Sequence, residues 1–268
     1  MGTSQQAPTA LHGQYTAVIE VAAADPADRV GEMGFVMGGT VYGLMGTDSL
    51  GRDLWEGLLF GFPIALTIAV VASVLVTVSG AGLGIISGYT GGTTDLVIQR
   101  VADIVSNVPL LPLLIFLVFI MGPNLFLIIL MLVAFSWPGL TILVWSMVLH
   151  VRSGQLVEAA LSMGASRWRI MLRHVFPTTA PFVLAQMIFF APSAILAEAA
   201  LSFLGLGDPS LPTWGQILEA GFRTGAVYVG YWWWIIPPGV LIIITAMAFT
   251  FLALATEPVV NPRLRRGA

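Results

Sequence analysis

Two glutamates of this sequence stand in the same five-residue context, EAALS, at Glu158–Ser162 and again at Glu198–Ser202. The second copy lies within a long apolar run, where an ionised carboxylate costs about 2.5 kcal/mol or more. A carboxylate at such a place faces either a water-filled pathway or a hydrogen-bond partner on a neighbouring helix. Glu198 is therefore a candidate for solute or ion passage or for a structural hydrogen bond. Glu158 lies in a polar stretch between two apolar runs, so its role depends on the residues that surround it there.

Enzymatic chemistry has little support among the other residues. The chain contains no cysteine, and all 11 of its cationic side chains are arginines. It therefore lacks a thiol nucleophile, a thiolate metal site and the phosphate-binding lysine of a nucleotide-binding loop. Neither histidine nor aspartate lies inside the long apolar runs, which argues against an intramembrane protease. If ATP powers this protein, another chain binds it, and we expect no cofactor or metal on this one.

The composition indicates that helices in a membrane must position these glutamates. Of the 268 residues, 57% are hydrophobic and 9% are charged, whereas a soluble domain carries roughly 25% charged residues. About 20 apolar residues cross the hydrocarbon layer as one helix. Five such runs cover approximately residues 63–87, 105–121, 125–149, 182–206 and 232–256. The sequence thus predicts an all-α polytopic membrane protein with a transmembrane domain over residues 63–257.

The arginines indicate which loops face the cytoplasm, because positive side chains near the membrane are enriched on that side. Arg152, Arg167, Arg169 and Arg173 lie between the third and fourth runs, and three more arginines follow the fifth. Between the fourth and fifth runs there is only Arg223. We therefore expect the loop 150–181 and the tail 258–268 to be cytoplasmic, in a multi-pass protein of the cell membrane.

The N-terminal part is harder to reconcile with five spans. A cytoplasmic C-terminus would leave residues 1–47 as an extracytoplasmic segment, yet they contain no signal peptide. Either the N-terminus is unusual in facing outward, or a first transmembrane helix precedes Met1. We favour the second alternative. Residues 48–62 follow as a polar turn and a short amphipathic segment.

The loop 150–181 is the one long polar segment between spans. The stretch SGQLVEAALSM predicts a helix, Gly164 ends it, and Ser166 can cap a second helix that runs to Pro177. Small residues surround the glycine, namely Ala159, Ala160 and Ala165. Such a loop suits either docking into a groove of another protein or an interfacial helix whose arginines face lipid phosphates. The residues alone do not decide between these two.

The first span ends in a stripe of small residues. Gly80, Gly84 and Gly88 recur at every fourth position, and such a stripe lets another helix approach closely. The partner helix could belong to this chain or to a second subunit.

A resemblance to a known family bears on the loop. The residues Glu158, Ala159, Ala160, Gly164 and Pro177 resemble the EAA loop of importer-type ABC transporter permeases. The segments GTDSLGRD, GYTGG, SWPGL, AILAEAALSFLGLG, PTWGQIL and NPRLR resemble, in family order, the branch of dipeptide, oligopeptide and nickel importers. This resemblance covers residues 44–266. Family members have six helices, and many have an arginine where Trp145 stands here.

The resemblance implies a transport subunit that is not an enzyme. In such permeases the EAA loop is a coupling helix seated on a separate ATPase chain, which binds the ATP and Mg²⁺. Among the coupling residues, Glu158 would then contact the ATPase, and Ala159 and Ala160 would permit a close fit to it. Gly164 would set the elbow after the helix, where Ala165 and Ser166 also lie. The arginines of the loop would anchor it to lipid headgroups, each contributing about 1 kcal/mol.

The same resemblance implies partners and a mechanism. A second homologous permease subunit, two ATPase subunits and an external solute-binding protein are expected, and no nucleic acid is. The spans would alternate between inward-facing and outward-facing states to pass peptides or a related small solute. The alternative is a secondary transporter or channel that uses Glu198 in an ion or proton pathway, although no internal repeat is visible.

Overall fold

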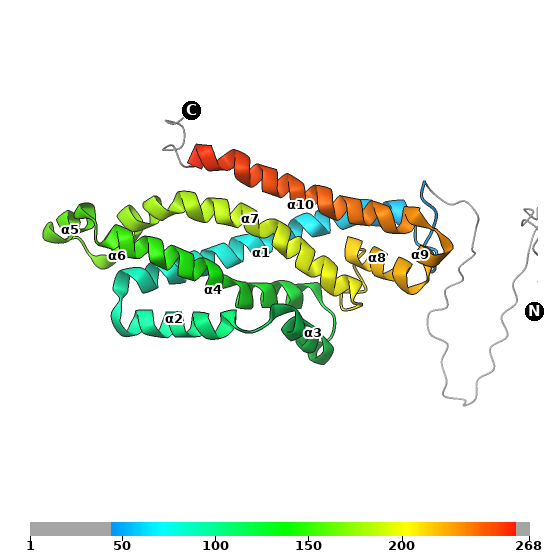
Figure 1. The fold of residues 1–268 in the computed structure, drawn as a ribbon, viewed down its shortest axis with the longest axis horizontal. Coiled ribbons are helices and arrows are strands. Elements are labelled where there is room, and N and C mark those ends of the chain that lie inside the picture. The colour runs from blue at the N-terminus through cyan, green and yellow to red at the C-terminus, as the bar shows by residue number, and fades with distance from the viewer. Residues whose placement is uncertain (1–43, 261–268) are drawn as a thin grey trace, which may run out of the picture. The chain divides into compact units, whose positions relative to one another are not determined.

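The computed structural model describes residues 44–260, and side chains as far as Thr256. Residues 1–43 and 261–268 lie outside it, so most of the predicted extracytoplasmic segment and most of the predicted tail are not described. The described part is helical apart from an isolated β-bridge between Thr47 and Asp53. In chain order its elements are α1 (Leu54–Thr90), α2 (Gly92–Ser106), α3 (Leu110–Met121), α4 (Leu125–Arg152), α5 (Gln155–Ser162), α6 (Arg167–Ile170), the π-helical turn η1 (Met171–Val175), α7 (Phe176–Phe203), α8 (Trp214–Arg223), α9 (Ala226–Val229) and α10 (Trp232–Val260) (Figure 1).

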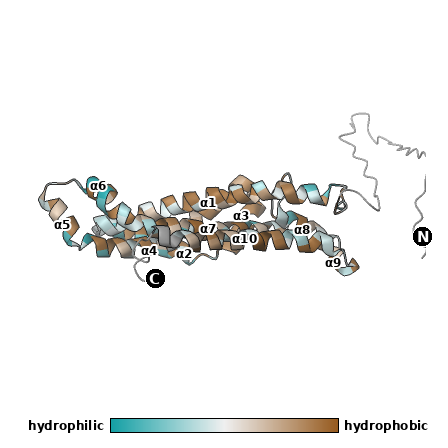
Figure 2. Cartoon of the chain, turned by 90° about the horizontal axis from the view of Figure 1, so that it is seen from above, coloured by the Kyte–Doolittle hydropathy of each residue, from teal (hydrophilic) through white to brown (hydrophobic). Residues whose placement is uncertain are grey.

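Four long helices are apolar enough to cross a membrane. They are α1, α4, α10 and the continuous helix formed by α6, η1 and α7 over Arg167–Phe203. Helix α1 packs against α4 and α7, and α7 packs against α10 (Figure 1). Figure 2 shows these helices mostly in the hydrophobic colour, whereas α6 is largely hydrophilic. The membrane character that composition predicts is thus carried by this bundle.

The first span begins earlier than predicted. Asp53 caps α1, because its Oδ1 accepts hydrogen bonds from the backbone N–H groups of Trp55 at 2.8 Å and Glu56 at 3.2 Å. The helix then continues through Pro63 to Thr90. The predicted amphipathic segment 48–62 is therefore a turn followed by the first turns of α1 rather than a separate element.

The predicted second span, 105–121, is broken in two. Helix α2 ends at Ser106, α3 begins at Leu110, and the two are bent by 81°. The cause is local, because Val108 precedes Pro109 and a residue before proline disfavours the helical conformation. With 12 residues, α3 alone is shorter than the roughly 20 residues that cross a bilayer, and the bent pair of α2 and α3 counts as a fifth span only if both cross together.

The predicted end of the second loop helix at Pro177 is also wrong. The chain passes through η1 instead, where Phe176 N–H donates to the carbonyl of Met171, five residues earlier. A proline lacks an N–H and clashes with the carbonyl four residues before it, and a wide π turn at that point removes the clash. The predicted loop 150–181 therefore does not end at a break before the fourth span, because the helix that begins at Arg167 continues without interruption to Phe203.

The glycine stripe of α1 lies against α4. A Cβ atom at Gly84 would be 2.7 Å from the carbonyl oxygen of Thr141, and one at Gly88 would be 2.9 Å from the Cβ of Val148. The buried hydroxyl of Thr141 donates to the carbonyl of Gly80 at 2.9 Å. The three glycines thus serve a close contact inside this chain, which answers the question that the sequence left open.

Candidate functional site

Helix α5, which carries Glu158, is fixed to the bundle by one face. Val157 and Ala160 are buried in a hydrophobic cluster that also contains Val148 of α4 and Met171 and Val175 of η1. These residues come from three separate elements, so the buried face of α5 lies against the end of α4 and the start of the helix that continues as α7. The spacing of three residues between Val157 and Ala160 places both on one side of the helix.

The opposite face of α5 is open. Glu158 and Ala159 are exposed, as are Leu156, Leu161 and Met163. Ala160, by contrast, is only 3% exposed, so the expectation that both alanines contact an ATPase is corrected for this residue. Its small side chain permits close packing, but against the cluster of this chain. The exposed face combines one carboxylate with apolar side chains, a composition that suits a protein partner better than water.

The elbow after α5 is a Schellman motif. Ala165 N–H donates to the carbonyl of Ala160 at 3.1 Å, and Gly164 N–H donates to that of Leu161 at 2.9 Å. Gly164 has a φ of +78°, in the left-handed region, and no atom lies within 4 Å of where its Cβ would be. Backbone conformation, and not lack of space, is therefore what requires glycine at this position.

Ser166 begins the next helix, where its Oγ accepts from Arg169 N–H at 3.4 Å. Arg167, Arg169 and Arg173 follow it and are exposed. Arg152 differs from these three, because its Nη1 donates to the carbonyl of Gly88 at 3.5 Å. This hydrogen bond joins α4 to the end of α1, where a cation is favourable because it lies near the C-terminal end of a helix. The prediction of Arg152 as a lipid anchor did not include this contact.

Glu198 is buried near the end of α7. Its side chain is 4% exposed, and it lies five residues before the last residue of the helix, Phe203. Its Oε1 accepts a hydrogen bond of 2.6 Å from the hydroxyl of Ser202. That hydroxyl accepts in turn from Thr213 Oγ1 at 3.3 Å. The carboxylate therefore belongs to a buried chain of hydroxyl groups.

Helix α8, which the sequence did not predict, covers this cluster. Thr213 is its N-cap, and a Cβ at Gly215 would lie 2.7 Å from the carbonyl of Ala199. Trp214 anchors the same end of α8 to α1, because its Nε1 donates to the carbonyl of Leu58 at 2.9 Å. The signal was present in PTWGQIL, where a threonine precedes an amphipathic stretch. Of the two roles that the sequence left open for Glu198, this contact favours the structural hydrogen bond.

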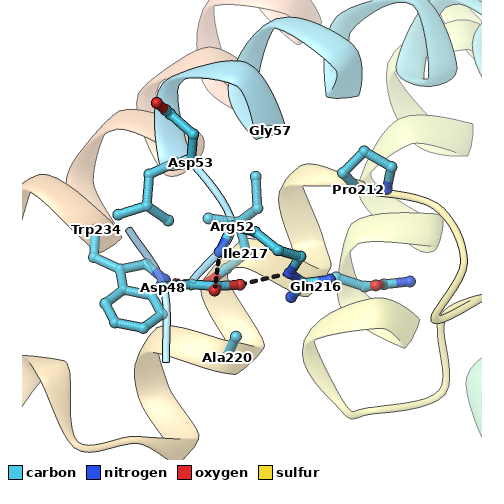
Figure 3. A pocket seen from close by; sticks show the side chains of 10 residues that line it. Asp48, Arg52, Asp53, Gly57, Pro212, Gln216, Ile217, Ala220 and Trp234 are labelled. Carbon is cyan, nitrogen blue, oxygen red and sulfur yellow. Dashed lines mark hydrogen bonds and ion pairs between the residues drawn. The ribbon is translucent and has the colours of Figure 1, made fainter. Parts of the chain in front are cut away.

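The GTDSLGRD turn lies against α8 and α10. The carboxylate of Asp48 accepts from the backbone N–H groups of Leu50 at 2.8 Å and Arg52 at 2.9 Å, and from Arg52 Nε at 2.6 Å. Side chains of the turn, α8 and α10 converge on a cavity of about 40 Å³ (Figure 3). The carboxylate of Asp48 therefore closes the turn, while Asp53, the second acidic residue of the motif, caps α1.

Asp208 ties the loop after α7 to α4. Its carboxylate accepts from Ser210 Oγ at 2.6 Å, from Ser210 N–H at 3.0 Å and from Leu125 N–H at 3.3 Å. The hydroxyl of Ser210 is the main cause that lowers the pKa of Asp208 below its ordinary value. This loop lies outside the membrane-spanning helices, and its ionised carboxylate holds their ends together.

Comparisons with known proteins agree with this architecture. Residues 80–266 match the family described as "Binding-protein-dependent transport system inner membrane component". The dipeptide transport system permease protein DppC of Bacillus subtilis (strain 168) is 34% identical over 222 residues, which cover 82% of this chain and 69% of that protein. The oligopeptide transport system permease protein OppC of the same organism is also 34% identical over 222 residues, covering 82% and 72% of the two chains.

The fold is shared with a solved structure. An inward-facing conformation of the MetNI methionine ABC transporter has a TM-score of 0.64 and 21% identity, covering 78% of this chain and 98% of that one. Together with the family match over more than half of the sequence, these findings agree with the several apolar helices described above. The chain belongs to the family of binding-protein-dependent transport system inner membrane components and has the importer-type ABC permease fold.

Proposed function

We propose that this chain is one permease subunit of an ATP-driven importer and forms half of a translocation pathway for peptides or a related small solute. The relatives named above are permease proteins of dipeptide and oligopeptide transport systems, which supports peptides as the solute. The chain itself binds no nucleotide in this proposal. A separate pair of ATPase subunits holds ATP and Mg²⁺, and a second homologous permease and an extracytoplasmic solute-binding protein complete the assembly.

The observation that carries the proposal is the two-sided helix α5. One face packs with α4 and η1 in a single cluster, and the other presents Glu158 and exposed apolar side chains. A push by the ATPase on the outer face would pass through Val157 and Ala160 to the spans, because packed interfaces move as rigid bodies. In this arrangement α5 and the C-terminal tail face the cytoplasm, as the arginine distribution predicts.

A secondary transporter that uses Glu198 has less support. The carboxylate is covered by the N-terminal end of α8 and already accepts a hydrogen bond from Ser202. The two grooves of about 320 and 370 Å³ between the long helices do not include Glu198 in their lining. We therefore assign Glu198 to the contact between α7 and α8.

The proposal is tested by placing a charge on the outer face of α5. Met163 is 81% exposed just after this helix, and Tyr228 is 84% exposed on α9 at the other end of the bundle (Figure 1). Met163→Asp should reduce co-purification of the ATPase subunits with the complex by roughly 10-fold or more, since an apolar side chain buried in an interface becomes a charge. Tyr228→Asp should leave ATPase co-purification unchanged. Equal ATPase retention by both variants would contradict the proposal.

A further inference from the structure

A groove of about 320 Å³ lies between α1, α4 and α7. Its polar lining consists of Thr77 from α1, Ser136 from α4, and Gln186 and Ser193 from α7, with Phe189 and Phe190 beside them. No charged side chain is among the described residues that line it. The volume lies in the range of about 300–1,000 Å³ that small-molecule sites occupy.

The groove lies at a depth where polar side chains are unusual. Gln186 is close to the middle of the 37-residue helix Arg167–Phe203, and Ser136 is close to the middle of the 28-residue helix α4. Hydrocarbon offers polar groups no hydrogen bonds, so such groups face protein or a water-filled cavity at this depth. Four of them gathered in one groove therefore indicate a face turned away from lipid.

Thr77 supplies an independent observation. Its side chain is 4% exposed, and the described residues give its Oγ1 no hydrogen-bond partner. Two other hydroxyl groups of α1 behave differently, since Ser73 donates to the carbonyl of Val70 at 3.1 Å and Ser79 donates to that of Leu75 at 2.8 Å. A buried hydroxyl without a partner costs free energy. Thr77 lines the groove, but its unpartnered oxygen is itself buried, so a rotation about the Cα–Cβ bond must bring the hydroxyl to a group that enters the groove.

We propose that this groove is a solute subsite of the translocation pathway, in which neutral side chains hydrogen-bond the backbone amide groups of a peptide. The proposal rests on the proposed function of the chain as an importer permease. Hydroxyl and carboxamide groups both donate and accept, so they match the N–H and C=O of any peptide bond. The two phenylalanines give the solute side chains an apolar surface, and the lack of charge leaves the site indifferent to which ionised side chains the peptide carries.

The absence of cysteine from the chain makes a direct test available. Ser136→Cys and Ser193→Cys each place a single, nearly isosteric thiol in the groove of the complete transporter. Ser79→Cys is the matched control, because Ser79 lies on α1 near the depth of Thr77, outside the groove and bonded to its own helix. A charged methanethiosulfonate reagent, which reacts only in water, is applied to each complex in vesicles, and labelling of this chain is followed by mass.

The groove thiols should react at least 10-fold faster than the control, and a transported dipeptide should slow them several-fold. Reaction no faster than that of Ser79→Cys would mean that lipid or a second permease subunit covers the groove, and would overturn the proposal. The proposal would also be overturned if the groove thiols reacted fast but the dipeptide did not slow their labelling, provided that the wild-type complex transports the dipeptide. Absence of transport by the wild type would instead refute the proposed function, so the two failures are distinguishable.

A second variant measures recognition. Thr77→Val keeps the shape of the side chain and removes only the hydroxyl group, so it tests the hydrogen bond without a change in packing. Loss of one such bond to solute should raise KM for a dipeptide about 2- to 10-fold, while assembly with the ATPase is retained. An unchanged KM in an assembled complex would contradict the role of Thr77.

Discussion

Gly164 offers the sharpest test of the elbow that follows α5. Its φ of +78° lies in the left-handed region, and its Cβ position is free of neighbours. Gly164→Ala therefore introduces no clash, and its cost is that of the backbone conformation alone, about 1–2 kcal/mol. That cost corresponds to a factor of roughly 5–30 in the population of the native elbow. ATPase affinity should fall by a factor of that size if the ATPase recognises α5 in this position.

The assay is binding of purified ATPase to the permease pair in detergent, with ATP-dependent peptide uptake in vesicles as a second readout. Gly164→Asn is the conservative variant, because asparagine tolerates the left-handed region better than alanine. This variant should therefore lose less ATPase affinity than Gly164→Ala. Gly82→Ala is the matched control, since Gly82 lies in α1 with no atom near its Cβ position. Equal losses for alanine and asparagine would refute the conformational argument and indicate instead that the ATPase contacts Gly164 itself.

Three further predictions concern the bundle. Gly84→Ala should lower the free energy of unfolding by about 1–3 kcal/mol, measured by denaturant titration in detergent, because its Cβ would lie 2.7 Å from the carbonyl of Thr141; stability equal to that of Gly82→Ala would contradict the packing. Ser202→Ala should destabilise by about 1–3 kcal/mol, since it removes a hydroxyl that donates to the buried carboxyl group of Glu198, whereas Glu198→Gln keeps an acceptor and should retain both stability and transport. Asp208 has a lowered pKa, so its contribution to stability is present above the ordinary pKa near 3.9 and is lost as pH falls through the lower folded-state value. Wild type should therefore lose more stability than Asp208→Asn on acidification below about pH 4, and parallel profiles would contradict this assignment.

Local rules explain which parts of the site could be predicted from sequence. Gly164 and Ser166 form a helix end and a helix start whose requirements lie within a few residues, so the elbow was predictable. The same rules misled at Pro177, because a π turn, which no short pattern specifies, carries the helix through the proline. The break before Pro109 follows from the restricted conformation of Val108, but the apolar run across it concealed the signal.

Burial by distant segments was not predictable in the same way. Ala159 and Ala160 are identical in type and adjacent in sequence, yet only Ala160 joins the cluster with α4 and η1. Which alanine faces the bundle is determined by how α5 packs on α4 and η1, and that packing involves residues far apart in the sequence. Glu198 is covered by α8 from beyond the end of its own helix. The apolar runs and the elbow of the loop thus follow from composition and local sequence rules, whereas the positions of Ala160 and Glu198 depend on tertiary contacts.

The central claim is that the outer face of α5 contacts the ATPase. Because the chain has no cysteine, Leu161→Cys accepts a single benzophenone label on that exposed face. Irradiation of the assembled transporter should cross-link this chain to an ATPase subunit, with a yield that changes when ATP and Mg²⁺ are added. The same label on Tyr228→Cys should give no such product. Absence of the ATPase cross-link from position 161 in a complex that transports solute would contradict the account.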